Sequence, residues 1–132
     1  MAIKTYPGTY KWVDAVTKCS QDGKDVKGEL PTPRSTIESE WYVHWAKGQR
    51  PAVGIFWLGV NDRDVVGEYT NQHGSPITYF NWAPNQPNQN GDEKCVVTGG
   101  AVMHAKKWRD TWCTSEKELL CVVGKSVILI NS

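Results

Sequence analysis

The stretch Ile55-Phe56-Trp57-Leu58-Gly59-Val60 decides the fold, because the pattern of the chain changes at this point. It is a continuous apolar run, which is typical of a strand that is buried on both faces. The segments before it show helical periodicity, and those after it are short strand-like runs between polar turns. Two helices followed by several short strands predict an α+β domain rather than a βαβ series.

The segment before this strand predicts a helix that begins near Ser35. The spacing Ser35-x-x-Glu38 fits a capping box, in which Ser35 caps the helix and Glu38 reaches back to it. Ile37, Trp41 and Trp45 then recur every four residues. This spacing predicts that these three side chains face the core.

A first helix is predicted further upstream, where apolar residues follow the spacing i, i+3, i+4 and i+7. The residues in this pattern are Trp12, Ala15, Val16 and Cys19. Residues 3–6 are expected to form an opening strand, and Pro7-Gly8 after them is a turn signal. Downstream of the decisive run, strand segments are expected at residues 68–70, 78–82, 95–98, 107–109 and 119–123.

The composition excludes several classes of function. The 132 residues carry a net charge of +1 with no basic stripe, so nucleic acid is not an expected partner. No apolar run approaches the length of a membrane span. The three histidines are scattered and no nucleophile–base pair is visible, so we expect no enzyme. The length fits one domain over residues 1–132, and the 7 Trp and 5 Tyr predict an aromatic core.

The four cysteines favour disulfides over metal binding. They form no C-x-x-C pair and do not alternate with histidines, which excludes the usual zinc spacing. An even number in a small, Trp-rich domain is typical of a secreted protein with two disulfides, whereas four buried thiols in the cytosol are the alternative. Spacing alone leaves three connectivities open for Cys19, Cys95, Cys113 and Cys121.

One polar stretch lies between two of the expected strands. Asn85-Gln86-Pro87-Asn88-Gln89-Asn90-Gly91-Asp92-Glu93-Lys94-Cys95 is too rich in Asn, Pro and Gly for a helix or strand. Its amide and carboxylate oxygens are the donors that a hard cation such as Ca²⁺ prefers. The alternative is a solvated surface loop that binds nothing.

An ordered set of motifs resembles the C-type lectin-like domain in its short, two-disulfide form. The match spans residues 9–123. The motifs are Trp12-x-x-Ala15-x-x-x-Cys19, Gly28-x-Leu30, Ser35-x-x-Glu38, Trp57-Leu58-Gly59-Val60, Asn81-Trp82-x-x-x-Gln86-Pro87-Asn88, Glu93-x-Cys95, Trp108-Arg109-Asp110-x-x-Cys113 and Leu120-Cys121. The resemblance implies the C-type lectin-like fold, with two helices packed on short antiparallel sheets and a long binding loop. It also implies the disulfides Cys19–Cys121 and Cys95–Cys113.

The resemblance further implies a calcium-dependent lectin that binds vicinal hydroxyls of a carbohydrate. Position by position, the metal ligands implied are Gln86, Asn88, Glu93 and Asp110, and the sugar contacts implied are Gln86, Asn88, Glu93, Trp108 and Arg109. Pro87 is the position at which the family usually has a cis-proline, which turns both neighbouring side-chain oxygens toward the metal. Calcium takes 6–8 oxygens, so a protein that supplies about five or six leaves room for two hydroxyls.

Two departures from the family pattern keep an alternative open. Arg109 stands where sugar-binding members have Asn, and a guanidinium cannot ligate calcium. It swings out to the solvent or toward the sugar, or it takes the place of the cation and pairs with Glu93 and Asp110. In addition, Gln86-Pro87-Asn88 lies between the galactose-type and the mannose/GlcNAc-type tripeptides. The alternative function is a calcium-independent protein-binding module, with an ice- or surface-binding domain as a third hypothesis.

The apolar tail predicts one more element. Residues 126–132 are expected to add a C-terminal strand, because an exposed apolar strand at a sheet edge is a liability. It is expected to pair with residues 3–6, and a homodimer interface is the alternative.

Overall fold

The computed structural model describes residues 2–21, 28–49, 54–88, 91–101 and 103–124. It contains the two helices and the short strands that define the predicted α+β class, which is therefore confirmed. In chain order the elements are β1 (Ala2–Tyr10), α1 (Trp12–Ser20), α2 (Thr36–Gln49), β2 (Ile55–Asn61), β3 (Cys95–Gly99), β4 (Arg109–Thr111) and β5 (Lys117–Val123).

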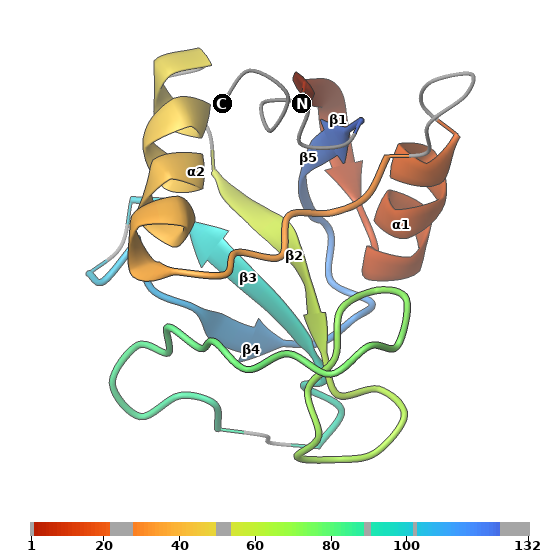
Figure 1. Cartoon of the computed structure of the whole chain (residues 1–132), viewed down its shortest axis with the longest axis vertical. Coiled ribbons are helices and arrows are strands. Elements are labelled where there is room, and N and C mark those ends of the chain that lie inside the picture. Colours follow the sequence, from red (N-terminus) through yellow and green to blue (C-terminus); the bar gives the residue numbers. More distant parts are fainter. Residues whose placement is uncertain (1, 22–27, 50–53, 89–90, 102, 125–132) are drawn as a thin grey trace, which may run out of the picture.

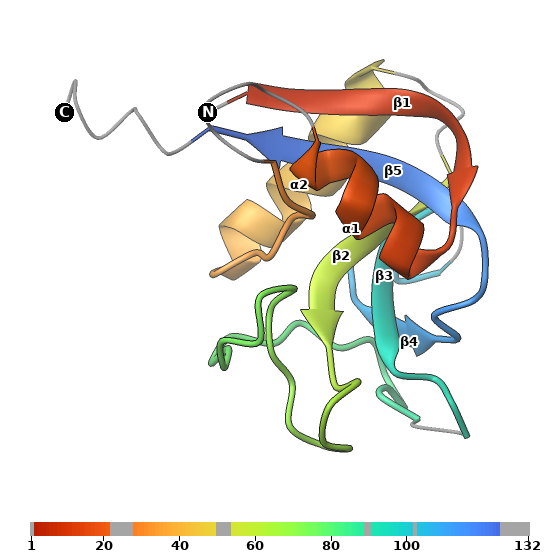
Figure 2. The same ribbon diagram turned by 90° about the vertical axis from the view of Figure 1, so that its right-hand side faces the viewer.

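The strands form one mixed sheet in the order β1-β5-β2-β3-β4. Its neighbouring strands are antiparallel, except that β2 and β5 run parallel with Phe56 opposite Glu118. A parallel pair is compatible with this chain because β2 and β5 lie far apart in sequence and need no tight turn between them. β1 and β5 form a long pair at the end of the molecule opposite the loops of residues 62–88 (Figure 2).

Strand β2 is buried on both faces, as its apolar run predicts. Phe56, Leu58 and Val60 pack in one core cluster with residues of α2. Trp57 points the other way and packs in a second cluster with Trp12 and other residues of α1. Successive side chains of a strand alternate between faces, so one strand supplies both cores. The helices accordingly lie on opposite sides of β2 (Figure 1).

The first helix agrees with its predicted pattern. Trp12, Ala15 and Cys19 are buried, and the disulfide from Cys19 to Cys121 fastens α1 to the central part of β5. The indole N–H of Trp12 donates to the carbonyl oxygen of Leu58 (2.9 Å). This bond satisfies the one polar group of an otherwise apolar contact.

The second helix turns a different face to the core from the one predicted. Ile37 is 83% exposed and Trp41 is 41% exposed, although Trp45 is partly buried. The buried face consists of Ser39, Tyr42, Val43 and Ala46. Those positions also follow helical spacing. They include the polar residue Ser39, so a pattern based on large apolar side chains does not identify them as the core face. Ser35 caps the helix as predicted, because its Oγ accepts from the Glu38 N–H (3.1 Å). The return bond differs by one residue, since Glu38 Oε1 accepts from the Arg34 N–H (3.1 Å).

Three predicted boundaries are wrong. Pro7 and Gly8 lie inside β1, where the register against β5 shifts and Gly8 has φ +90°, so they form an irregularity of the strand and no turn. Residues 68–70 and 78–82 form isolated bridges in place of strands. Tertiary packing of these short segments against β2 and β4 overrides their strand propensity. The predicted strand of residues 126–132 lies outside the described residues, and residues 3–6 pair with β5.

In the described part of the chain, no helix combines the length and the apolar character needed to cross a membrane.

Replacing Ser39 by Ala is expected to lower the free energy of unfolding by about 1–3 kcal/mol. Ser39 is buried, and its Oγ accepts the indole N–H of Trp108 (2.9 Å), which the variant leaves unpaired. Urea unfolding with the disulfides intact measures the change. Ser115→Ala is the control, because the structure gives the Ser115 side chain no hydrogen bond, and an equal loss in both variants would contradict the assigned role of Ser39.

We expect the free energy of unfolding to fall at high pH because of Tyr42. Burial, with a smaller contribution from the nearby Glu38, raises the pKa of Tyr42 from 10.0 to about 12. The folded state therefore holds this proton more tightly than the unfolded state, so the stabilisation is complete below pH 10 and is lost as the pH rises toward 12. Wild type is expected to lose more stability than Tyr42→Phe as the pH rises from 10.0 to about 12, as measured by urea unfolding. Parallel losses in the two proteins would refute the assignment.

Candidate functional site

The long loop that contains the polar stretch is held against the start of β4. Trp82 and Trp108 form a parallel bridge. The Ala83 N–H donates to the Trp108 carbonyl (2.9 Å), and the Trp108 N–H donates to the Asn81 carbonyl (2.8 Å). These bonds fix the chain just before the polar stretch. The loop segments of residues 62–88 lie at the opposite end of the molecule from the helices (Figure 1).

Trp108 anchors this region from inside the core. It is 0% exposed, and its ring meets Tyr79, Phe80 and Trp82 edge to face at 5.6–6.5 Å between centroids. The expectation that Trp108 contacts a sugar is therefore wrong, because the core covers its side chain completely. Its role is to position the two residues that follow it, Arg109 and Asp110.

Three of the four expected metal ligands come together. The Gln86 Oε1 accepts the Asp110 N–H (3.1 Å), and Asp110 Oδ1 accepts the Asn88 N–H (3.2 Å). Asp110 is only 5% exposed and lies in the middle of β4, opposite Val96 of β3. The Gln86–Pro87 peptide bond is cis. The tripeptide that begins at Gln86 is thus fastened directly to the carboxylate after Trp108.

Glu93, the fourth expected ligand, lies immediately before β3. The Lys94 N–H donates to the Asp92 carbonyl (2.8 Å), which makes a tight turn centred on Glu93. Its Oε1 atom is buried and has no hydrogen-bond partner among the described residues. A buried carboxylate oxygen is costly to leave unpaired, so this atom is suited to a cation.

The donor set fits a hard divalent cation by its chemistry. Gln86 and Asn88 carry amide oxygens, Glu93 and Asp110 carry carboxylates, and oxygen is the donor that calcium prefers. The only formal negative charges in this set are those of Glu93 and Asp110. Consistent with that, no cluster of three or more His, Cys, Asp or Glu able to hold a metal occurs in the described ranges.

Arg109 faces away from the donor set. Its guanidinium donates to the Gly99 carbonyl (2.8 Å) and to the Lys107 carbonyl (3.2 Å). Neighbouring residues of a strand point to opposite faces, which separates Arg109 from the buried Asp110. Partial burial lowers the pKa of Arg109. Arg109 therefore supplies no ligand oxygen, and its two hydrogen bonds engage the guanidinium with main-chain carbonyls in place of Glu93.

The supporting residues around the site were not predicted. Ser39 of α2 binds the indole of Trp108, and the Lys107 Nζ donates to the Asn81 Oδ1 (3.1 Å). No local motif marks Ser39 or Lys107, because tertiary packing alone brings them to Trp108 and Asn81. The disulfide from Cys95 to Cys113 closes the region by joining β3 to the segment after β4.

Comparison with known proteins places the chain in a family. A family model described as the lectin C-type domain matches residues 8–123. The tetranectin-like protein of Carcharhinus perezii is 37% identical over 94 residues, which cover 71% of this chain and 55% of that protein. The chain thus spans about half the length of that relative.

Solved structures share the fold. The C-type lectin CEL-I from Cucumaria echinata superposes with a TM-score of 0.80 at 21% identity, over 92% of this chain and 89% of that one. A calcium-independent type II antifreeze protein superposes with a TM-score of 0.73 at 24% identity, over 90% and 82% of the two chains. The family match, which covers most of its length, shows that the chain belongs to the C-type lectin domain family.

Proposed function

We propose that this domain binds carbohydrate through one calcium ion held by Gln86, Asn88, Glu93 and Asp110. Binding is non-catalytic, and its extracellular setting is consistent with the two disulfides. The observation that carries the proposal is the buried Oε1 of Glu93, which lacks a partner in the described structure. A divalent cation would offset the cost of burying that oxygen.

The geometry of the loop supports a preformed donor set. Asp110 is held in β4 and is fastened to Gln86 and to Asn88 by the two hydrogen bonds described above. Ordering these side chains in advance reduces the entropy lost when a ligand binds. Calcium at this position would coordinate two vicinal hydroxyls of a sugar, while the amides of Gln86 and Asn88 offer N–H donors to the same hydroxyls.

The charge of the donor set predicts weak calcium binding. Only two of the four side chains carry a formal charge, and Arg109 contributes no oxygen. Affinity for calcium falls as the number of charged ligands falls. We therefore place the dissociation constant at about 10⁻⁴–10⁻³ M, in the range of extracellular modules.

Arg109 also favours a second candidate, a calcium-independent protein-binding module. The residue that would complete the donor set is tied to the carbonyls of Lys107 and Gly99. One structural neighbour is described as a calcium-independent antifreeze protein, so the same fold exists in a calcium-independent form. The fold by itself does not decide between the two.

Glu93→Gln is expected to weaken calcium binding at least about tenfold, because it removes one of the two formal charges of the site and keeps the shape of the side chain. Calorimetric titration with calcium measures this change, and a second titration with galactose or mannose at saturating calcium measures the sugar.

Glu116→Gln is the matched control. It makes the same change at an exposed residue that accepts a hydrogen bond from Thr9, and it should leave calcium binding unchanged. Calcium should also raise the melting temperature of the wild type, because a ligand that binds only the folded state stabilises it. A melting temperature that neither calcium nor chelator shifts would reject the calcium site and support the protein-binding module.

Arg109→Asn is expected to raise the calcium affinity only about twofold, since it removes a positive charge one residue from Asp110 while strand alternation turns the new amide away from that carboxylate. The same calorimetric titration tests it. Lys106→Asn removes an exposed positive charge from the connection before β4 and serves as the control for the charge alone. An equal small gain in both variants is the expected result, and a much larger gain in Arg109→Asn than in Lys106→Asn would show that position 109 reaches the metal and would contradict the direction assigned to Arg109.

A further inference from the structure

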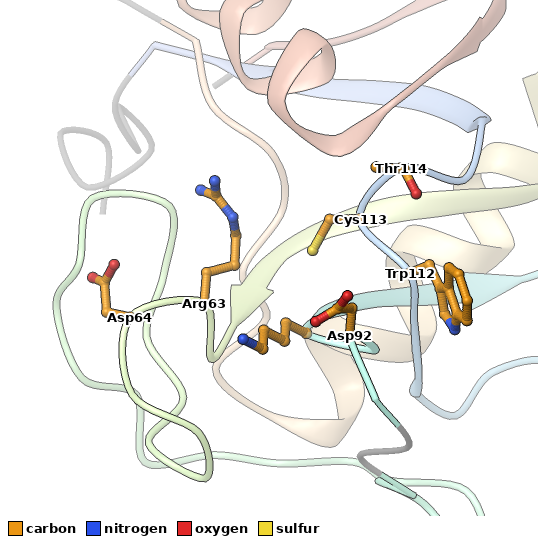
Figure 3. Close-up of a pocket in the computed structure, with 7 residues that line it drawn as sticks. Arg63, Asp64, Asp92, Trp112, Cys113 and Thr114 are labelled. Carbon is orange, nitrogen blue, oxygen red and sulfur yellow. The ribbon is translucent and has the colours of Figure 1, made fainter.

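A pocket of about 430 Å³ lies on another side of the loop region (Figure 3). Three segments line it: the turn after β2, the turn before β3, and the chain that follows β4. Its main lining residues are Arg63, Asp64, Asp92, Lys94, Trp112 and Cys113. None of the four proposed calcium ligands lines it. The volume falls within the range of small-molecule sites.

The pocket brings together charges of both signs. Arg63 and Lys94 carry positive charges, and Asp64 and Asp92 carry negative ones. Within the described structure, no hydrogen bond or ion pair joins any two of these four side chains. The charged groups of Asp64, Asp92 and Lys94 are therefore available to a ligand, and the guanidinium of Arg63 has the edge that does not pack on Trp12.

Aromatic rings flank the charged groups. Trp112 is 54% exposed and lines the pocket. The guanidinium of Arg63 lies over the ring of Trp12, and its Cζ atom is 4.9 Å from the ring centroid. This contact holds Arg63 in place on the wall formed by the turn after β2. In Figure 3, Asp92 lies between Arg63 and Trp112.

The walls are fastened by covalent and main-chain bonds. Cys113 is disulfide-bonded to Cys95 at the start of β3, and the Lys94 N–H is bonded to the Asp92 carbonyl. Asp92 and Lys94 flank Glu93 in the tight turn, so the same turn presents Glu93 to the proposed metal site and its two neighbours to the pocket. The pocket is thus built on a rigid part of the loop region.

We propose that this pocket is a second, metal-independent site for a small zwitterion that carries a phosphate and a quaternary ammonium. An anion alone would meet Asp64 and Asp92, and a cation alone would meet Arg63 and Lys94. A zwitterion satisfies both pairs. Arg63 and Lys94 suit the phosphate, because a guanidinium binds it with two parallel N–H groups and an ammonium adds a point charge. The exposed face of Trp112 together with Asp92 suits the quaternary ammonium.

Titration with phosphocholine, followed by two-dimensional ¹⁵N NMR in the presence of a chelator, tests this proposal independently of the calcium site. We expect saturable shifts of the Trp112 indole N–H, with a millimolar dissociation constant. Inorganic phosphate alone and choline alone should each bind at least about tenfold more weakly. Vesicles of phosphatidylcholine, assayed by cosedimentation, distinguish a lipid head group from a soluble form of the same chemistry.

Variants locate the ligand. Asp92→Asn and Trp112→Ala change exposed residues and should each weaken phosphocholine binding about tenfold, as followed at the backbone amide of Lys94, while Glu40→Gln on α2 should not. Unchanged amide shifts elsewhere establish that the variants are folded. Absence of shifts at Trp112, equal binding of phosphate and phosphocholine, or stronger binding of galactose at the same indole would each overturn the proposal. A failure of calcium binding would leave this result untouched, because the titration contains no calcium.

Discussion

The hydrogen bond from the Trp108 indole N–H to Ser39 Oγ is the contact on which the binding region depends. Both residues are 0% exposed, and the bond joins α2 to the strand segment that carries Arg109 and Asp110. A buried indole needs a partner for its one N–H, so the helix cannot shift along the sheet without leaving that group unpaired. The main chain of the same tryptophan then fixes the long loop through Asn81 and Ala83. One side chain thus sets the distance between the helical layer and the loop.

Much of this fold could be predicted from local patterns, and the misses have physical causes. The apolar run of β2 predicts a buried strand, and the helical spacing from Trp12 to Cys19 predicts the buried face of α1. The structure confirms both predictions. The second helix carries two candidate faces, and the one with Trp41 is the more apolar. The face with Ser39 is the buried one, because Ser39 accepts a hydrogen bond from the indole of Trp108, which is far from it in the sequence. No window of neighbouring residues contains that information.

The site shows the same division. The ordered motifs identify Gln86, Asn88 and Asp110, and the hydrogen bonds among them bring all three together. The motifs could not predict the direction of Arg109, because that depends on the strand alternation of β4 and on the carbonyl oxygens of Gly99 and Lys107. They also suggested a surface role for Trp108, which the aromatic packing of the core excludes. Residue type predicts which chemistry a site offers, whereas tertiary packing decides which atoms are presented.

The balance of charge around Glu93 separates the two functions that the fold allows. A buried carboxylate oxygen without a partner costs free energy in the folded state, so the native structure must hold an ion near it or carry that cost. The guanidinium of Arg109 is bonded to the carbonyl oxygens of Lys107 and Gly99. Lys94 lines the separate pocket on the other side of the tight turn. Among the residues described, no side-chain cation pairs with Glu93, which is why an external cation is the simpler account of its burial.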